Sequence, residues 1–191
     1  ARREAACEKL RALGASSFAI DYANPVALEQ AMAGCDAVVH IAAYLKMWGP
    51  WADFEASNVT LTDQVLTAAK ACGVKRFVHV SAASVVMQEA MPVIHADESA
   101  PLTSLRHLPY SATKAIAETH VLAAHSDNLK TVALRPPLIW GSGDTVDGDL
   151  GDQVRKGQFA WIDRGDYPYA TCHVQNLSHA IALALWSEVT G

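Results

Sequence analysis

The chain has 191 residues, of which 51% are hydrophobic and 18% charged, as expected for one globular domain or a domain with part of a second. Its formal net charge of -5 argues against nucleic acid or an anionic membrane as the main partner, because binding phosphates needs a basic face. No apolar run approaches the roughly eighteen residues that span a bilayer, and the polar first residues do not resemble a signal peptide. The four cysteines lack metal-ligand spacing and favour a reduced, cytoplasmic setting.

Glycine, proline and capping residues divide the first part of the chain into alternating helices and strands. Residues 2–13 predict a helix, and residues 17–21 a short apolar strand. A second helix is expected to begin after the Asn24 cap and to end at Gly34. Residues 37–43 form an almost continuous apolar run, which is typical of a strand buried on both faces of a parallel sheet.

The alternation continues through the middle of the chain. Residues 52–72 predict a long helix, and Asn58 falls on its apolar stripe. The next strand is expected over residues 76–81, followed by a loop from about residue 87 to residue 109.

A further helix is expected from residue 109 or 110 to about residue 125, and a strand over residues 131–135, which two prolines stop. Beyond Trp140 the chain is expected to be rich in loops until Asn176 caps a last helix. Strands that alternate with helices in this way predict a doubly wound α/β fold with a parallel sheet.

Open α/β sheets bind ligands at the carboxyl ends of their strands, so residues in those places are the candidates for a site. The sharpest pair is Tyr110 and Lys114, whose spacing of four residues puts both side chains on one helix face. A lysine ammonium beside a tyrosine hydroxyl favours the phenolate, so we expect a pKa lowered from about 10 and proton exchange near neutral pH. The alternative is a surface helix that carries an unrelated tyrosine and lysine.

Other chemistry is less favoured by the residues. A buried Asn58 is expected to hold a backbone group or water near the site, or to make a plain core hydrogen bond. His40 and His79 fall within strands and are expected to be core groups with partners. No metal site is expected, because the sequence has no HExxH motif and no Cys/His cluster, and no GxSxG elbow indicates a hydrolase. The acids Asp144, Asp147, Asp149 and Asp152 are interpreted as a solvated loop rather than a calcium site.

Five segments in order resemble the extended short-chain dehydrogenase/reductases, also called the NAD-dependent epimerase/dehydratase family. They are Asp21-Tyr22, DAVVHIAA (36–43), Asn58, the YxxxK pair Tyr110 and Lys114, and LRPPLIWG (134–141). Within the family the sequence is most similar to the 3β-hydroxysteroid and sterol dehydrogenase branch, with sugar-nucleotide epimerases and dihydroflavonol-type reductases as close alternatives.

The resemblance implies a Rossmann-like sheet in residues 1–140, and in residues 141–191 the start of a small substrate lobe plus a returning helix. It implies catalytic roles for Tyr110, Lys114 and a nearby serine. The cofactor would be NAD or NADP. Arg2 and Arg3 fall where the 2′-phosphate of NADP would be bound, which is a hint towards NADP. The cofactor-binding residues that it implies are Asp21, Tyr22, Ile41, Ala42, Ala43, Asn58, Ser81, Tyr110, Lys114 and Pro137.

Two departures from the family pattern stand out. The family opens with a strand and a GxxGxxG loop that holds the pyrophosphate, and this sequence contains neither. We therefore expect an internal portion of a longer protein, whose strands flank a gap and which binds dinucleotide poorly by itself. The second departure is Ala82 at the position of the family's catalytic serine or threonine; we select Ser81 over Ser84, and Val86 replaces the usual aromatic residue.

The function that the resemblance implies is hydride transfer between nicotinamide and a secondary alcohol or ketone. A nucleotide-sugar epimerase or dehydratase, and a dinucleotide-binding regulatory protein with weakened catalysis, are the alternatives. The expected partner is a small-molecule substrate, with a homodimer as the oligomeric state to test. An apolar substrate pocket, or packing between lobes, is expected from Met47, Trp48, Trp51 and Trp140.

Overall fold

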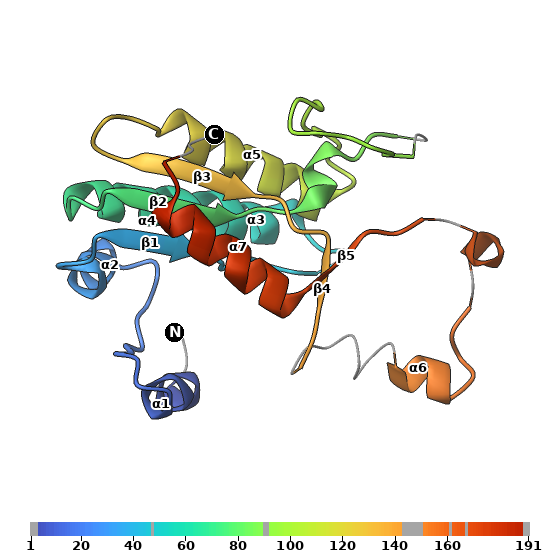
Figure 1. Ribbon diagram of the computed structural model, residues 1–191, viewed down its shortest axis with the longest axis horizontal. Helices are drawn as coiled ribbons and strands as arrows, with labels where there is room; N and C mark the ends of the chain where they lie inside the picture. Colours follow the sequence, from blue (N-terminus) through green and yellow to red (C-terminus); the bar gives the residue numbers. More distant parts are fainter. Residues whose placement is uncertain are drawn as a thin grey trace.

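A three-stranded parallel sheet lies at the centre of the molecule (Figure 1). The computed structural model describes residues 4–46, 48–89, 92–142, 151–160, 162–166 and 168–188. The strand order is β1-β2-β3, and the sheet is built from β1 (Ala37–His40), β2 (Arg76–Val80) and β3 (Lys130–Leu134). All five β2 residues are buried, as is typical of a central strand, and the strand predicted over residues 76–81 is confirmed.

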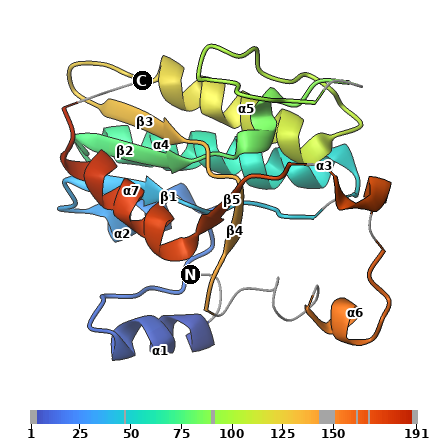
Figure 2. The same cartoon turned by 45° about the vertical axis from the view of Figure 1, so that its right-hand side comes forward.

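Helices cover both faces of this sheet, which confirms the doubly wound α/β architecture. On one face lie α2 (Pro25–Met32), α4 (Leu61–Ala71) and α5 (Pro109–Ala123), and on the other lies α7 (Val174–Trp186), as Figures 1 and 2 show. The guanidinium Nε of Arg76 donates to the Ala184 carbonyl over 2.8 Å and ties α7 to β2. The main apolar core contains Leu28, Leu61, Val65, Leu66, Val74, Phe77, Val121 and Leu129.

The long helix expected over residues 52–72 is present but is not uniformly α-helical. It consists of α3 (Trp51–Phe54), the π-helical segment η1 (Glu55–Thr60) and α4. A π turn widens the helix locally and redirects the side chains that it carries, and such turns are frequent at functional sites. Here the widened segment carries Asn58.

Two strand predictions need correction. Residues 17–21 form no strand, and β1 ends at His40 rather than at residue 43. A strand exists only where a neighbour accepts its backbone hydrogen bonds, and within the described ranges β1 pairs with β2 alone. The three described strands are contiguous, and residues 17–21, which were expected to flank the gap together with residues 37–43, have no strand partner in the described ranges.

A second, two-stranded parallel sheet extends beyond the first one and was not predicted. It pairs β4 (Leu138–Trp140) with β5 (Thr171–His173). The assignment of the cap to Asn176 was wrong, because α7 begins at Val174 and the His173 ring accepts from the Gln175 N–H. The split of the chain at residue 140 stays a prediction.

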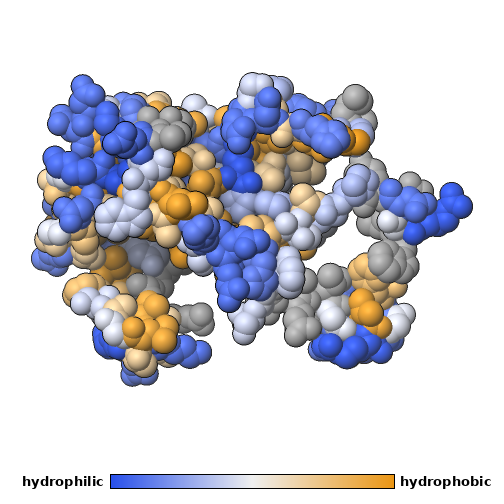
Figure 3. All heavy atoms as spheres, viewed as in Figure 1, coloured by the Kyte–Doolittle hydropathy of each residue, from blue (hydrophilic) through white to orange (hydrophobic). Residues whose placement is uncertain are grey.

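The remaining described elements are α1 (Glu4–Ala12), η2 (Ala83–Val86), α6 (Gly151–Arg155) and η4 (Ile162–Gly165). Figure 3 shows apolar surface over α1, and Leu10 in that helix and Leu13 directly after it are exposed. In the part of the chain that the structure describes, no helix combines the length and the apolar character needed to cross a bilayer.

Replacement of Gly141 by alanine is expected to destabilise the junction between the two sheets. Gly141 has φ +150°, and an added Cβ would lie 2.6 Å from Cγ1 of Val174. Backbone strain and overpacking together predict a loss of about 3 kcal/mol in the free energy of unfolding. Gly73→Ala is the matched control, because Gly73 has φ +70° with open space around it, so about 1 kcal/mol is expected. Equal losses in urea titrations would contradict the packing argument.

Candidate active site

The carboxyl ends of the three parallel strands meet at one edge of the sheet, as the fold predicts. The chain continues side by side beyond that edge. The Ser81 N–H donates to the Leu134 carbonyl over 2.7 Å, and the Ala83 N–H donates to the Pro136 carbonyl over 2.9 Å. The segments that follow β2 and β3 therefore form one backbone surface beside the N-terminal half of α5.

Lys114 lies inside this edge with only 1% of its surface exposed. Its Nζ donates to the Val80 carbonyl over 2.8 Å and lies 3.1 Å from Nε2 of His79. Burial lowers the pKa of the Lys114 ammonium to about 8, and the Glu118 carboxylate one helical turn away opposes that shift. The ammonium thus points into the end of β2.

The expected lowering of the Tyr110 pKa is not what the structure shows. Burial raises the pKa of the phenol, because the half-buried ring disfavours the phenolate. The physical reason for the difference is the orientation of Lys114, whose ammonium is bonded to β2. Tyr110 and Lys114 share one face of α5, as their spacing predicts, but in this arrangement the phenol is a proton donor at neutral pH.

Asn58 joins three elements from its place in the π-helical segment, where it is 1% exposed. Its Oδ1 accepts the Tyr44 N–H over 2.7 Å, and its Nδ2 donates to Thr113 Oγ1 over 3.0 Å. The Thr113 hydroxyl proton goes to the Pro109 carbonyl, which fixes the direction of the bond from Asn58. The asparagine therefore holds a backbone group, one of the two roles expected for it, and sets the position of α5 beside the loop after β1.

Ser81 is buried and Ser84 is half-buried, and the Oγ atoms of both serines are buried. Ala82 itself is extended, and the 3-10 turn η2 follows it directly. The Oγ atoms of Ser81 and Ser84 have no hydrogen-bond partner among the described residues. An unpaired buried hydroxyl has a free-energy cost unless another molecule accepts or donates to it, so both serines have the capacity to bind a ligand group.

His40 and His79 are core groups, as predicted, and Nε2 of each has a partner, whereas Nδ1 of His79 has none among the described residues. The register of β1 and β2 pairs them, and their rings stack with centroids 5.4 Å apart. Nε2 of His40 lies 2.9 Å from Thr62 Oγ1, whose own proton goes to the Asn58 carbonyl, so His40 is the donor. Burial lowers the pKa of His40 to about 4 and that of His79 to about 2, and the nearby Lys114 ammonium adds to both shifts.

A buried ion pair was missed by the sequence reasoning. Glu118 is fully buried, and its Oε1 accepts from Nη2 and Nε of Arg135 over 2.7 and 3.0 Å. Glu118 continues the row of Tyr110 and Lys114 at the same spacing of four residues, which is the signal that could have revealed it. The pair ties the segment after β3 to the middle of α5.

The other predicted cofactor positions differ in their contacts and exposure. Asp21 accepts the Ala23 N–H over 3.0 Å, Tyr22 packs on the main core, and Ile41 is 66% exposed. Ala42, Ala43 and Pro137 are half-buried. Arg2 and Arg3 lie outside the described residues, as do Asp144, Asp147 and Asp149.

The aromatic side chains proposed for a substrate pocket have partners within the chain. The Arg106 guanidinium lies 4.0 Å from the centre of the Trp51 ring, and Trp140 meets His173 edge-on. Trp48 is 78% exposed, and Met47 is not among the described residues. A pocket lined by these residues stays a prediction.

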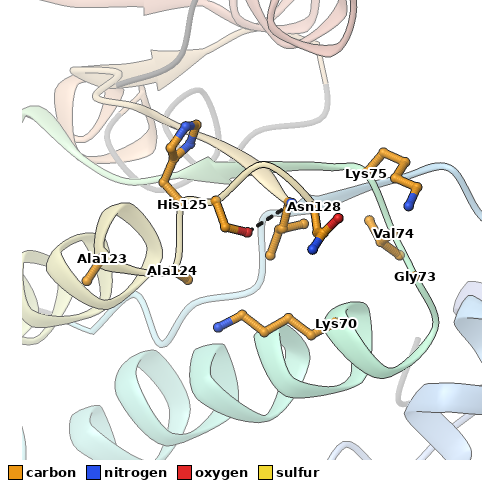
Figure 4. A pocket seen from close by; sticks show the side chains of 10 residues that line it. Lys70, Gly73, Val74, Lys75, Ala123, Ala124, His125 and Asn128 are labelled. Atoms are coloured by element: carbon orange, nitrogen blue, oxygen red, sulfur yellow. Dashed lines mark hydrogen bonds between the residues drawn. The ribbon is translucent and has the colours of Figure 1, made fainter.

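A pocket of about 640 Å³ lies at the opposite edge of the sheet, where the amino ends of β2 and β3 meet the ends of α4 and α5 (Figure 4). Lys70, His125 and Asn128 line it. It is therefore separate from the edge that carries Lys114. Within the described ranges no group of three or more His, Cys, Asp or Glu side chains is arranged to hold a metal ion.

The parallel sheet, the polar carboxyl edge and the YxxxK helix together define a Rossmann-type domain of the extended short-chain dehydrogenase/reductase class. Residues 2–187 match the model of the 3-beta hydroxysteroid dehydrogenase/isomerase family, and the chain belongs to that family.

Two curated relatives are each 39% identical to the chain. One is a 4-hydroxy-2-methyl-3-oxo-4-farnesyl-3,4-dihydroquinoline-1-oxide ketoreductase of Stigmatella aurantiaca, where the match covers 96% of this chain and 55% of that protein. The other is a 2-alkyl-3-oxoalkanoate reductase of Stenotrophomonas maltophilia, with 96% and 56% covered. The chain thus spans little more than half the length of these relatives.

Solved structures confirm the fold at lower identity. A dTDP-glucose 4,6-dehydratase from Streptomyces venezuelae with NAD bound is 24% identical, with a TM-score of 0.82 over 98% of this chain and 60% of that one. A UDP-glucuronic acid 4-epimerase from Bacillus cereus, in complex with UDP-glucuronic acid and NAD, gives a TM-score of 0.77 at 22% identity over 96% and 60% of the two chains.

Loss of the Asn58 amide is expected to destabilise the contact between η1 and α5. Asn58→Leu leaves the half-buried Tyr44 N–H unpaired and removes the bond to Thr113, so we expect a loss of about 2 to 3 kcal/mol in the free energy of unfolding. Thr113→Val removes the partner on α5 and is expected to cost about 1 kcal/mol. In a double-mutant cycle, the loss of stability in the double mutant should be smaller than the sum of the losses in the two single mutants. Full additivity would mean that the Asn58–Thr113 bond does not couple the elements.

The two buried histidines predict that the free energy of unfolding decreases as the pH is lowered. An unfolded histidine binds a proton below about pH 6.5, whereas folded His40 resists protonation down to about pH 4 and His79 to about pH 2. The free energy of unfolding should therefore decrease below pH 6.5 by up to about 1.4 kcal/mol per pH unit for each histidine.

His40→Gln is the control for this pH dependence, because a glutamine amide keeps the donor to Thr62 and cannot titrate. Urea titrations between pH 6.5 and 5 should show a shallower slope for this variant. An unchanged slope would exclude His40 as a source.

Proposed function

We propose that the chain is the nucleotide-binding part of an NAD(P)-dependent oxidoreductase that acts on a secondary alcohol or ketone. The observation that carries the proposal is the pair of Tyr110 and Lys114 on one face of α5, at the sheet edge where doubly wound folds bind their ligands. The curated relatives support it, since both names describe reductases of ketones.

The residues at the edge fit a nicotinamide nucleotide. The Lys114 ammonium has three N–H groups, of which two are directed to Val80 and His79; the third has no partner among the described residues and is suited to hold a ribose hydroxyl. The buried Ser81 hydroxyl has no partner among the described residues and is suited to orient a substrate oxygen. When bound, the nicotinamide supplies or accepts the hydride, and the protein provides placement and charge.

The acid-base group of the proposed reaction is Tyr110. Because burial raises its pKa, the phenol keeps its proton at neutral pH and is suited to donate it to a carbonyl oxygen. This state favours the direction of ketone reduction. The resemblance also assigns Asp21, Tyr22, residues 41–43, Asn58 and Pro137 to the proposed cofactor surface.

The substrate proposed is a ketone with apolar substituents, since the two curated relatives are named for a farnesyl quinoline oxide and 2-alkyl-3-oxoalkanoates. A nucleotide-sugar epimerase or dehydratase on the same scaffold is the alternative. A small-molecule substrate, a homodimer and a cytoplasmic location stay predictions for the whole protein.

The test is activity of the complete protein with NADH and NADPH against ketosteroids, 3-oxoalkanoates and UDP-sugars. Tyr110→Phe removes the proposed proton donor, so kcat should fall by about 10²- to 10⁴-fold while the Kd for the dinucleotide changes little. Tyr169→Phe is the matched control, because Tyr169 is 73% exposed, and it should leave kcat unchanged.

Turnover of UDP-sugars alone would favour the epimerase or dehydratase. Dinucleotide binding without turnover of any of the three substrate classes would favour the regulatory alternative. A kcat that Tyr110→Phe does not lower would overturn the proposed role of the phenol.

A further inference from the structure

His79 is a buried histidine that the proposed reaction does not use, yet it lies directly against Lys114. It is fully buried in the central strand β2, and its Nε2 is 3.1 Å from the Lys114 Nζ. Because β2 residues alternate between the two faces of the sheet, His79 projects to the face that α5 covers. A buried histidine ring nitrogen normally has a hydrogen-bond partner. For His79 that partner is Lys114 at Nε2, whereas Nδ1 has none among the described residues.

The roles of donor and acceptor in this contact follow from the chemistry of the two groups. A lysine ammonium has only donors, so Nε2 of His79 must accept, and the histidine is neutral with its proton on Nδ1. The second Lys114 donor goes to the Val80 carbonyl, the backbone group next to His79. Two contacts from adjacent residues of one rigid strand therefore fix the direction of the third N–H.

The surroundings hold His79 in this state. On the β1 side the His40 ring stacks on it, and Thr62 in turn holds His40. On the α5 side the charged neighbours are Lys114 and Glu118, whose carboxylate is paired with Arg135. A proton on His79 would place two cations 3.1 Å apart in a buried site, which strongly disfavours that form.

We propose that His79 is a positioning residue that holds the Lys114 ammonium by accepting one of its hydrogen bonds, so that the free N–H is aimed at the cofactor ribose. This inference rests on the proposed function for the cofactor, but the contact between the two side chains exists independently of it.

The test compares two substitutions at one position. His79→Gln places an amide oxygen near the former Nε2 and keeps the acceptor, whereas His79→Leu keeps a similar volume without it. In the complete protein, His79→Leu should weaken binding of NADH or NADPH by roughly tenfold, measured as Kd by nucleotide fluorescence, and His79→Gln should stay within about twofold. The KM for the cofactor should follow Kd, and kcat should change less.

A second measurement needs no cofactor. The Lys114 titration, followed by NMR of a ¹³C-labelled lysine side chain, should move to lower pH in His79→Leu, because an acceptor favours the charged form, and should be retained in His79→Gln. The ¹⁵N shifts of His79 should show a neutral ring protonated at Nδ1. A purely structural role would lower Tm in both variants without separating their lysine titrations.

Equal lysine titrations in wild type and His79→Leu, or a ring protonated at Nε2, would overturn the inference. Equal losses of cofactor affinity in both variants would also overturn it, because shape rather than hydrogen bonding would then be responsible. Failure of the proposed function is distinct from these results: the wild-type protein would bind neither dinucleotide, while the separation of the lysine titrations would persist.

Discussion

The burial of one lysine is the constraint around which the candidate site is arranged. An ammonium withdrawn from water is costly unless hydrogen-bond acceptors and an opposite charge surround it. For Lys114 the acceptors are the Val80 carbonyl and the His79 ring, and the opposite charge is Glu118. All three are themselves buried or belong to the central strand. A shift of α5 along β2 would therefore break the hydrogen bonds of the buried Lys114 ammonium.

The same logic explains why α5 is held by polar contacts at successive turns. Asn58 holds Thr113 near the start of the helix, β2 holds Lys114 in the next position, and Arg135 holds Glu118 one turn later. Such bonds are directional, whereas apolar packing tolerates small shifts. The phenol of Tyr110 is thereby placed by contacts that it does not make itself. The π turn contributes here, because it brings Asn58 to a position where its amide reaches both Tyr44 and Thr113.

Much of the fold could be predicted because its signals are local. The strand at 76–81 and the Asn24 cap before Pro25 are indicated by a few adjacent residues, and both predictions are confirmed. Strand β5 could not be found in this way, because three residues become a strand only through pairing with β4, about thirty positions away. The start of α7 was misplaced because a histidine cap is rarer than an asparagine cap, and the sequence offers both within four residues.

The candidate site was predictable in its spacing and not in its electrostatics. The interval between Tyr110 and Lys114 shows that they share a helix face, but the direction of the ammonium depends on which side chain β2 presents below it. That choice follows from strand register, which pairs His40 with His79 across two segments. The sign of the Tyr110 pKa shift likewise follows from burial, which sequence spacing does not report.

Burial affects the lysine and the histidines in the same direction, yet it leaves them in opposite charge states at neutral pH. The pKa of Lys114 falls from 10.5 only to about 8, so the side chain remains a donor, while His40 and His79 start at 6.5 and become neutral. A charged donor and a neutral acceptor are the combination that the 3.1 Å contact requires. Two lysines in these places would repel, and two histidines would lack the charge that the proposed contact with a ribose hydroxyl uses. The ordinary pKa of histidine lies below neutrality and that of lysine lies above it. After burial, His79 is therefore still a neutral acceptor and Lys114 still a charged donor.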